Sequence, residues 1–294
     1  TAGRPFVFLN TKKRDCMRES AFWHPVAQST ALTDAPLGVE LLGESLVLWR
    51  DASGQAHAWA DRCPHRGARF SLGRVCNGHL ECPYHGWQFD AQGQCAHVPA
   101  LPEFVPPTTH RARTFAAQEQ YGLVWVCLDE ALGSAPPAFA AEADAQLRKV
   151  NCGPYDVATN APRIIENFLD MAHFGFVHDG WLGMRAATAI DDYSVEATST
   201  GLRATQCKAW QPQSNVHSTA PAQVEYTYEV VAPYTAVLTK VPDAASVALQ
   251  GFRESIALFI CPVTPESSRV WFRLAMADFE SPDAKLQDLS LIHI

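Results

Sequence analysis

Two short segments, Cys63-Pro64-His65-Arg66-Gly67 and Cys82-Pro83-Tyr84-His85-Gly86-Trp87, bring two cysteines and two histidines into one region of the chain. Reduced to these residue types, the pattern is C-x-H, sixteen residues, then C-x-x-H. Each segment contains a Pro, which fixes φ, and a Gly, which permits a tight turn. We therefore expect two loops that point one sulfur and one nitrogen each at a common metal centre.

Two kinds of centre use this donor set. A closed zinc site takes four Cys or His ligands in a tetrahedron, whereas in a Rieske [2Fe–2S] centre two Cys hold one iron and two His hold the other. The C-x-H spacing of the first loop differs from the C-x2–4-C of zinc fingers. A chain of 294 residues also does not need zinc as its folding core.

The segments CPHRG and CPYHGW resemble the Rieske motif of ring-hydroxylating oxygenases. The resemblance implies that Cys63 and Cys82 ligate one iron of a [2Fe–2S] cluster, while His65 and His85 ligate the other. Imidazole in place of thiolate raises the reduction potential, which suits an electron relay.

The bulk composition is that of a globular protein, with 47% hydrophobic and 18% charged residues. The net charge of −8 argues against nucleic acid or an anionic membrane as partner. No apolar run approaches the roughly eighteen residues of a membrane span. The chain starts at Thr1 without Met and without a signal-peptide pattern. Nine cysteines without framework spacing fit a reducing cytoplasm.

The first half is predicted to be an all-β domain over residues 15–125. Short apolar segments between Gly and Pro residues predict strands, and they form a small β-sandwich that carries the two loops. These segments are 39–42, 45–50, 56–60, 78–81, 87–90 and 123–128. A Gly- and Pro-rich stretch at 133–137 predicts a linker.

The second half is predicted to be an α+β domain over residues 150–288. Asn160 followed by Pro162 is a helix start signal, and 163–176 is expected to form a long helix. Alternating segments then predict a meandering antiparallel sheet beneath that helix, a helix-grip (START-like) arrangement. They are 190–197, 201–210, 223–232, 234–241, 253–262 and 268–277.

The expected helix carries a second group of metal-binding residue types. Glu166, Asp170 and His173 are spaced i, i+4 and i+7 and would share one helical face. His178 would lie about 140° away, so both histidines can meet one ion only if the helix distorts or ends near Gly175. The alternative is that the two histidines are ordinary half-buried residues and that Glu166 and Asp170 form a solvated acidic stripe. The apolar neighbours argue against it, because such polar groups are costly there unless paired or metal-bound.

The pattern E-N-x-x-D-x-x-H-x-x-x-x-H over residues 166–178 is similar to the mononuclear-iron motif of Rieske oxygenase α subunits. The resemblance spans nearly the whole chain when both motifs are taken together. It implies that His173 and His178 are two legs of a 2-His-1-carboxylate triad that leaves positions open for O2. Asn167 would lie near this iron.

The resemblance assigns a separate role to Asp170. In the family this acid links an iron-ligand histidine to a Rieske histidine of the neighbouring subunit in a head-to-tail homotrimer. Asp170 would therefore orient His173, as hydrogen-bond partners of metal ligands commonly do. It would also reach His85 across the interface. Glu166 is expected to be structural.

The third iron ligand of the family, an acid on the helix after the last strand, has no clear counterpart. Asp283 and Asp288 fall in the first turns of that helix, where acids are common for dipole reasons. The apolar run 289–294 breaks the amphipathic pattern and resembles a translated sequencing adapter. We expect it to be an artefact of a C-terminally truncated sequence, with the carboxylate ligand missing from this chain.

Together these features predict the terminal oxygenase component of a Rieske non-haem iron enzyme, in the monooxygenase or demethylase branch. It would hydroxylate or oxidatively demethylate a small aromatic or heterocyclic substrate with O2. No strand-linked G-x-G-x-x-G is present, so NAD(P)H electrons would come through a separate reductase or ferredoxin. The alternatives are a Rieske ferredoxin-like electron carrier and a zinc-stabilised binding module. Aromatic candidates for the substrate pocket, or equally for the plain core, are Phe174, Phe176, Trp181, Tyr226, Phe252 and Phe259.

Overall fold

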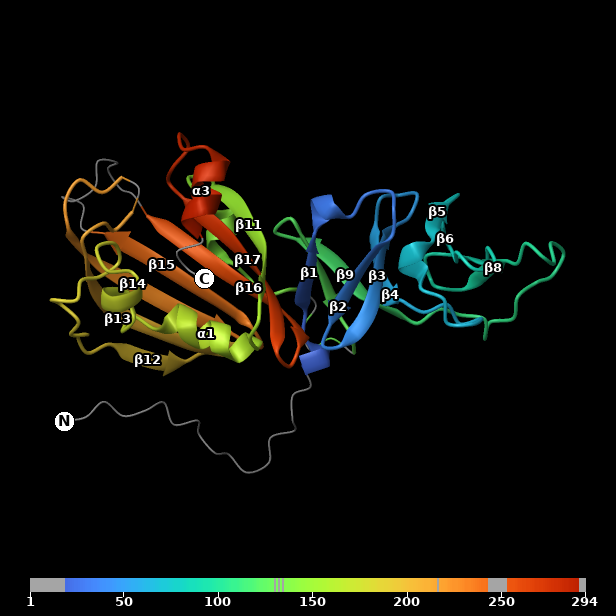
Figure 1. Cartoon of the computed structure of the whole chain (residues 1–294), viewed down its shortest axis with the longest axis horizontal. Helices are drawn as coiled ribbons and strands as arrows, with labels where there is room; N and C mark the ends of the chain where they lie inside the picture. The colour runs from blue at the N-terminus through green and yellow to red at the C-terminus, as the bar shows by residue number, and fades with distance from the viewer. Residues whose placement is uncertain are drawn as a thin grey trace, which may run out of the picture.

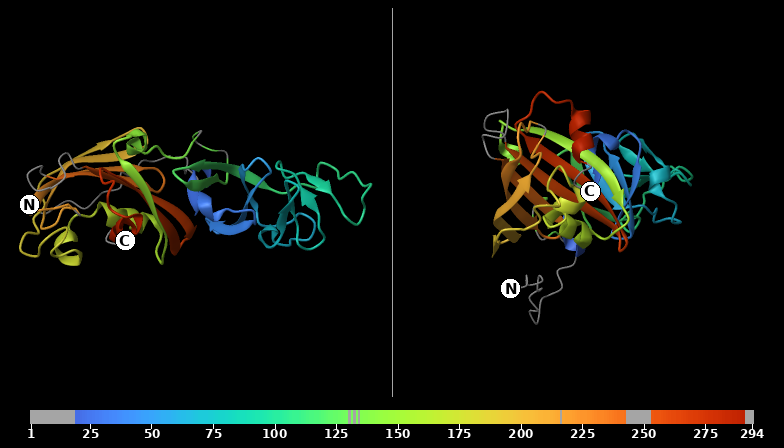
Figure 2. Two further views of the ribbon diagram at one scale, coloured as in Figure 1. Left: turned by 90° about the horizontal axis from the view of Figure 1, so that it is seen from above. Right: turned by 60° about the vertical axis from the view of Figure 1, so that its left-hand side comes forward.

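The computed structural model describes residues 19–129, 131, 133, 135–215, 217–242 and 253–290. Over these residues the chain is elongated, with a small β-structure at one end and a large curved sheet at the other (Figures 1 and 2). No helix in this part of the chain is long and apolar enough to cross a membrane.

The N-terminal sheet is antiparallel throughout. Its strands are β1 (His24–Gln28), β2 (Leu37–Leu41), β3 (Glu44–Arg50), β4 (Ala56–Ala60), β9 (Thr114–Gln120) and β10 (Leu123–Cys127), in the order β1-β10-β9-β4-β3-β2. Four of the predicted strands correspond to β2, β3, β4 and β10. Leu42 and Gly43 both have positive φ, and they form the two-residue turn that joins β2 to β3. Short 3-10 helices flank β1, namely η1 (Glu19–Ala21) and η2 (Ser29–Ala31).

A smaller sheet carries the second loop. It consists of β5 (Arg74–Cys76), β6 (His79–Glu81), β7 (Gln88–Phe89) and β8 (Cys95–His97) in sequential order, preceded by the 3-10 helix η3 (Phe70–Leu72). Buried aromatic rings beneath the loops contact each other edge to face. The ring centroids of Trp59 and Phe70 lie 5.7 Å apart, and those of Phe70 and Phe89 lie 5.2 Å apart. The Cys63 and Cys82 side chains belong to the same apolar cluster, so this core fixes both loops.

The C-terminal half forms one antiparallel sheet in the described residues, with the order β11-β17-β16-β15-β14-β13-β12. The strands are β11 (Arg148–Val157), β12 (Ser194–Ala197), β13 (Gly201–Gln211), β14 (Ala222–Val231), β15 (Thr235–Pro242), β16 (Glu254–Thr264) and β17 (Ser267–Met276). All six predicted alternating segments are confirmed as strands. β11 was not predicted, because Gly153 and Pro154 interrupt its alternation, and its register shifts there. The 3-10 helix η4 (Ala140–Ala143) precedes it.

The helices of this half lie on one side of the sheet (Figure 1). They are α1 (Ala161–Leu169), α2 (Phe174–Val177) and α3 (Asp283–Ser290). α1 packs against β15 and β16, whereas α3 packs against β11. The predicted fold class, an all-β domain followed by an antiparallel sheet with a helix laid on it, is confirmed.

The prediction of one long helix over 163–176 was wrong. α1 ends at Leu169, and Asp170 has an extended backbone. The Asp170 carboxylate accepts a hydrogen bond from the backbone N–H of Ala172 at 2.8 Å. A short acidic side chain can bond the backbone locally in this way and so competes with helix continuation. The chain turns here, and α2 starts four residues later at Phe174.

The two halves share a continuous apolar core. Phe259 of β16 is fully buried and stacks on Tyr121 at 5.4 Å, with Trp125 edge-on at 5.0 Å. The turn after β2 also bonds β16, since the N–H groups of Leu42 and Gly43 donate to backbone carbonyls at 2.8 Å. The end that carries the two Cys–His loops and the large sheet are therefore rigidly joined.

Candidate metal centres and substrate cavity

The two Cys–His loops have the same backbone plan. The N–H of Cys63 donates to the carbonyl of the fifth residue on, at 2.8 Å, and the N–H of Cys82 does the same at 2.9 Å. In each loop the Gly four residues after the Cys donates back to the Cys carbonyl. Gly67 and Gly86 have φ near +75° and +70°, a conformation that favours glycine. The two loops are thus matched turns, although His follows Cys by two residues in one and by three in the other.

The cysteine and histidine side chains of the two loops differ in how deeply they are buried. Cys63 and Cys82 are 2% and 3% exposed, whereas His65 and His85 are exposed. The two imidazole rings lie 4.7 Å apart between centroids. Trp87 stacks on His65 at 4.3 Å, which restrains the orientation of that ring. The arrangement places a sulfur pair inside and a nitrogen pair at the surface.

This arrangement fits a two-iron cluster better than a single ion. Among the described residues, no three His, Cys, Asp or Glu side chains converge closely enough to hold one metal ion. A tetrahedral zinc site requires such convergence, whereas each iron of a Rieske cluster takes only two protein ligands. Burial raises the pKa of the Cys63 thiol to about 12, with Cys82 beside it as a further cause. A thiolate pair at this depth therefore needs a cationic centre to stabilise it.

The second group of predicted residues surrounds the break between α1 and α2. The Asn160 side chain caps α1 by accepting from the N–H of Arg163 at 3.1 Å. Beyond the break, the rings of His173 and His178 lie 5.0 Å apart between centroids. The turn between α1 and α2, rather than a distortion at Gly175, therefore brings them together. Burial lowers the pKa of His178, and the neighbouring His173 lowers it further, which favours the neutral imidazole that binds metals.

Asp170 lies at the exposed side of this pair. Its Oδ2 is 3.3 Å from Nδ1 of His173, and its side chain is 47% exposed. The carboxylate can thus orient the imidazole while still facing outward. Glu166 is exposed as well and pairs with Arg163 at 2.6 Å on the surface of α1, so the expectation of a structural role is consistent with its contacts.

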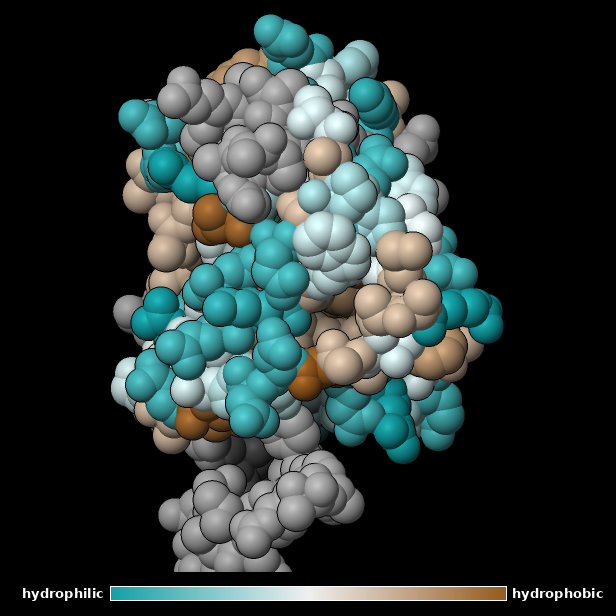
Figure 3. Space-filling model, turned by 90° about the vertical axis from the view of Figure 1, so that its left-hand side faces the viewer, coloured by the Kyte–Doolittle hydropathy of each residue, from teal (hydrophilic) through white to brown (hydrophobic). Residues whose placement is uncertain are grey.

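A cavity opens beside the two histidines. It has a volume of about 50 Å3, enough for a few water molecules. Its lining comes from α1, α2 and the inner face of the sheet: Asn167, Phe168, His173, Phe174, Val177, His178, Leu182, Tyr226, Tyr228 and Leu238. Figure 3 views this end of the molecule, where apolar side chains gather beside a hollow near the middle of the face.

Only some of the aromatic candidates from the sequence line this cavity. Phe174 and Tyr226 line it. Phe176 and Trp181 are exposed by 55% and 37% and are not part of the lining. Phe259 belongs to the core between the two halves, which was the alternative to a place in the pocket. Phe252 lies outside the described residues.

Of the two candidate third ligands, Asp283 forms no metal-binding group with the two histidines among the described residues. Asp283 at the start of α3 forms an ion pair with Arg148 of β11, as expected for an acid in a first helical turn. The side chain of Asp288 lies outside the described residues. Among the described side chains, no carboxylate joins His173 and His178 in a group of three that could hold a metal ion.

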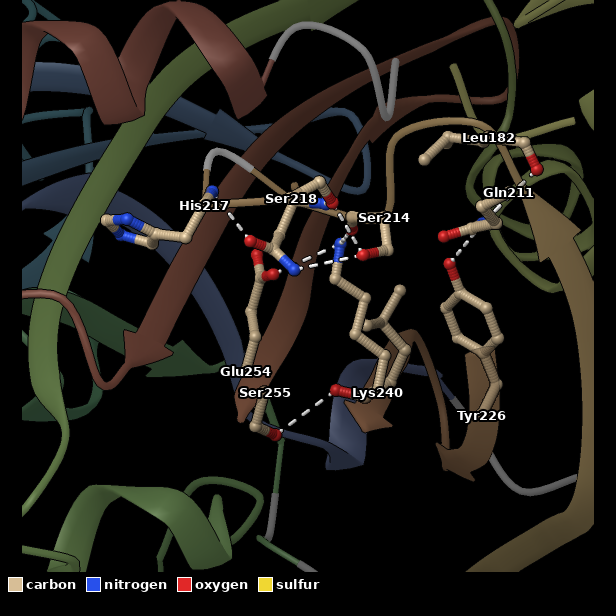
Figure 4. A network of polar contacts seen from close by, with 11 residues as sticks. Leu182, Gln211, Ser214, His217, Ser218, Tyr226, Lys240, Glu254 and Ser255 are labelled. Carbon is tan, nitrogen blue, oxygen red and sulfur yellow. Dashed lines mark hydrogen bonds and ion pairs between the residues drawn. The ribbon is translucent and has the colours of Figure 1, made fainter. Parts of the chain in front are cut away.

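A buried polar network that was not predicted lies behind the cavity wall (Figure 4). Gln211 at the end of β13 donates through Nε2 to the Tyr226 hydroxyl at 2.7 Å and to the Leu182 carbonyl at 3.2 Å. Further along the sheet, Lys240 pairs with Glu254 at 3.1 Å. Both charges fall on strands in the sequence, and alternation alone gave no sign that they face each other inside.

Two family models match the chain. The model of the Rieske [2Fe-2S] domain matches residues 22–116, and the vanillate O-demethylase oxygenase C-terminal domain matches residues 157–290. With the loop geometry and the histidine pair described above, these matches define a class: the chain belongs to the α subunits of Rieske oxygenases, a family that uses a [2Fe–2S] cluster and a mononuclear non-haem iron.

Named relatives are similar over part of their length. Methylxanthine N1-demethylase NdmA of Pseudomonas putida is 43% identical over 168 residues, which is 55% of this chain and 48% of the relative. The oxygenase component of dicamba O-demethylase from Stenotrophomonas maltophilia is 37% identical over 159 residues, 53% of this chain and 46% of the relative. The chain thus spans about half the length of these curated relatives.

The fold agrees with solved structures over a longer range. The structure of Pseudomonas putida CBB5 NdmA with caffeine superposes with a TM-score of 0.81 at 29% identity, covering 93% of this chain and 79% of the other. The similarity includes both the loop-bearing domain and the large sheet, because less than a tenth of this chain is left out.

Proposed function

We propose that this chain is the terminal oxygenase component of an enzyme that removes methyl groups from nitrogen or oxygen of small aromatic or heteroaromatic substrates. The main support is that one chain holds both sets of metal-binding residue types, the two Cys–His loops and the pair His173 and His178. The second set lies beside a cavity. The names of the N- and O-demethylase relatives support the methyl group as the point of attack. The overall change is R–N–CH3 + O2 + 2 electrons + 2 protons giving R–N–H, formaldehyde and water, or the same with oxygen in place of nitrogen.

The closeness of the rings within each histidine pair supports an assignment of the residues that would hold the metals. Cys63 and Cys82 would ligate one iron of the cluster, and His65 and His85 the other, while His173 and His178 would ligate the mononuclear iron. When bound, the cluster supplies one-electron transfer and the mononuclear iron supplies O2 chemistry. Asn167 lines the cavity beside the histidine pair, where its amide is available to the substrate or to a metal-bound ligand.

The positions of the two centres support electron transfer between copies of the chain. The small sheet that carries the second loop and the helix α1 lie at opposite ends of the elongated molecule (Figures 1 and 2). Asp170 is exposed next to His173, and His85 is exposed on its loop. A ring of head-to-tail copies, which we propose to be a homotrimer, would let Asp170 of one copy meet His85 of the next.

Exposed apolar side chains near both centres fit such an interface. On the cluster side Tyr84 is 62% and Val105 is 85% exposed, and on the other side Val177 is 70% exposed. Large exposed apolar residues gathered at functional ends indicate interaction surfaces. Electrons would come from a separate reductase or ferredoxin, and we propose a cytoplasmic location with no nucleic-acid partner, in keeping with the net charge of −8.

Metal content and product analysis test the proposal together. The full-length protein, purified without oxygen and reconstituted, should contain about three iron atoms and two acid-labile sulfides per chain. With a reductase and NADH, it should release formaldehyde from a panel of N-methyl and O-methyl aromatic compounds. Two irons per chain without formaldehyde would leave an electron carrier, and zinc without sulfide would refute the cluster.

A further inference from the structure

The side chain of Tyr228 brings a buried hydroxyl to the cavity wall. Tyr226 and Tyr228 are two residues apart on β14, so their side chains lie on the same face of the sheet. Both line the cavity beside the histidine pair. The Tyr226 hydroxyl lies 2.7 Å from Nε2 of Gln211. For the Tyr228 hydroxyl, no hydrogen bond is found within the described part of the chain.

The burial of Tyr228 shows where this hydroxyl lies. The residue is only 3% exposed, yet its oxygen is not one of the unpaired polar atoms that are sealed from solvent in the described structure. The hydroxyl therefore keeps some accessible surface, and the space that it faces is the cavity that Tyr228 lines. An O–H that is almost buried and has no acceptor is costly, so a ligand that accepts from it is favoured.

Aromatic neighbours hold the ring of Tyr228 in place. Tyr226 stacks on it, with 5.5 Å between the ring centroids and 10° between the ring planes. Phe168 of α1 contacts it edge to face, with 6.5 Å between the centroids. A ring that is packed on two sides turns little, so the hydroxyl keeps its direction when a ligand enters the cavity.

The Tyr228 hydroxyl is a hydrogen-bond donor at neutral pH. Burial raises the pKa of Tyr228 well above its usual value, and the phenol therefore stays protonated. Nearby Tyr226 and Cys207 and the Asp170 carboxylate add to this rise in pKa. The same carboxylate contacts His173, so the donor and the histidine pair are both close to Asp170.

Asn167 is the other uncharged donor of the cavity lining. Its side chain is exposed, so water satisfies its amide in the free protein and little is gained when a ligand replaces that water. His173 and His178 are the residues that would hold the iron. Tyr228 is therefore the donor in this lining for which a ligand acceptor makes the largest difference.

We propose that Tyr228 is a substrate-binding residue whose O–H donates a hydrogen bond to an acceptor atom of the aromatic substrate. This bond fixes which edge of the ring points into the cavity. Substrates with an oxygen or nitrogen acceptor at that edge bind better than substrates of the same shape with a C–H group there. The role deepens the proposed function and rests on it for the kind of ligand that enters.

Two probes of nearly the same shape test the role of Tyr228 in the full-length protein. Acetophenone has a carbonyl oxygen, whereas α-methylstyrene has a CH2 group in its place. In ligand-detected NMR titrations, Tyr228→Phe should weaken acetophenone binding about three- to tenfold and leave α-methylstyrene binding unchanged. Tyr193→Phe, at an exposed tyrosine outside the lining, should match the parent protein with both probes. Equal changes for both probes in Tyr228→Phe overturn the proposal.

Infrared spectroscopy of 13C-labelled acetophenone gives a second measurement that does not depend on affinity. In the parent protein the carbonyl band of the bound probe should lie below its position in an alkane solvent, because the carbonyl accepts a hydrogen bond. In Tyr228→Phe it should move back to that position. A bound band at the alkane position in the parent protein refutes the proposal, whatever the variant does. A lowered band that persists in Tyr228→Phe assigns the donor to another residue and also refutes it.

The binding result is independent of turnover. If Tyr228→Phe affects acetophenone as expected but no formaldehyde is produced with any substrate, the proposed function fails and Tyr228 stands as a donor to bound ligands. If demethylation is observed but Tyr228→Phe changes neither the affinities nor the carbonyl band, the function stands and the role of Tyr228 fails.

Discussion

The buried ion pair behind the cavity allows a quantitative test of how the large sheet is stabilised. Lys240 of β15 and Glu254 of β16 are register partners, with side chains only 6% and 10% exposed and 3.1 Å apart. We consider Lys240→Met, which keeps most of the side-chain volume and removes the charge. Glu254 would then be a buried carboxylate without its cation.

The expected cost follows from the distance and the burial. At 3.1 Å and an effective dielectric constant of about 20, the Coulomb attraction is about 5 kcal/mol. Desolvation of two ions costs several kcal/mol each, so the intact pair contributes little net stability. Removing one partner loses the attraction and leaves the other desolvated, and the free energy of unfolding should fall by about 3–5 kcal/mol. The double variant Lys240→Met/Glu254→Leu should recover most of this loss.

Urea denaturation at pH 7.5, followed by tryptophan fluorescence, measures these differences. Burial lowers the pKa of Lys240, but Glu254 and Tyr226 outweigh it and the pKa is raised. A raised lysine pKa gives stability that is complete below the unfolded value of about 10.4 and is lost only as pH rises through the folded value. The whole effect is therefore present at pH 7.5.

Arg163→Met at the exposed pair with Glu166 is the matched control, since a surface pair should contribute no more than about 1 kcal/mol. A loss below about 1 kcal/mol for Lys240→Met, or a double variant as unstable as the sum of its single variants, would refute the reasoning.

Cys63→Ser should abolish the visible absorption of the [2Fe–2S] cluster, because a serine hydroxyl does not replace the thiolate ligand. The control Cys95→Ser, at a buried thiol outside the loops, should retain this absorption. Equal spectra for the two variants would contradict the assignment of Cys63 as a ligand. Asp170→Asn should lower formaldehyde release about 10–100-fold with unchanged cluster absorption. Glu166→Gln, exposed on the same segment, should stay near the parent rate, and equal rates for both variants would argue against a role for Asp170. In the full-length protein, His178→Ala should reduce the iron content from about three to about two per chain, and an unchanged iron content would count against His178 as a ligand.

The local patterns determined the fold class and the identity of the candidate ligands. The Cys and His of the two loops are close in sequence, so Pro and Gly at short range suffice to predict their turns. The alternating segments between short turns likewise located every strand from β12 to β17. Burial alternates clearly in β14, where one face of the antiparallel sheet is buried. Where local signals conflicted, as at Gly153 and Pro154 in β11, the strand was missed.

Only the tertiary structure decided how distant residues meet. Helical periodicity could not reveal the break at Asp170, because a side-chain hydrogen bond to Ala172 competes with the helix, and this break places His173 beside His178. Phe259 looked like a pocket residue in sequence, yet its neighbours Tyr121 and Trp125 come from the other half of the chain. The Tyr226 hydroxyl accepts from Gln211, which also donates to the Leu182 carbonyl, and these partners come from other segments. Hydrogen-bond direction and charge balance inside a sheet arise from contacts between strands, and no single segment encodes them.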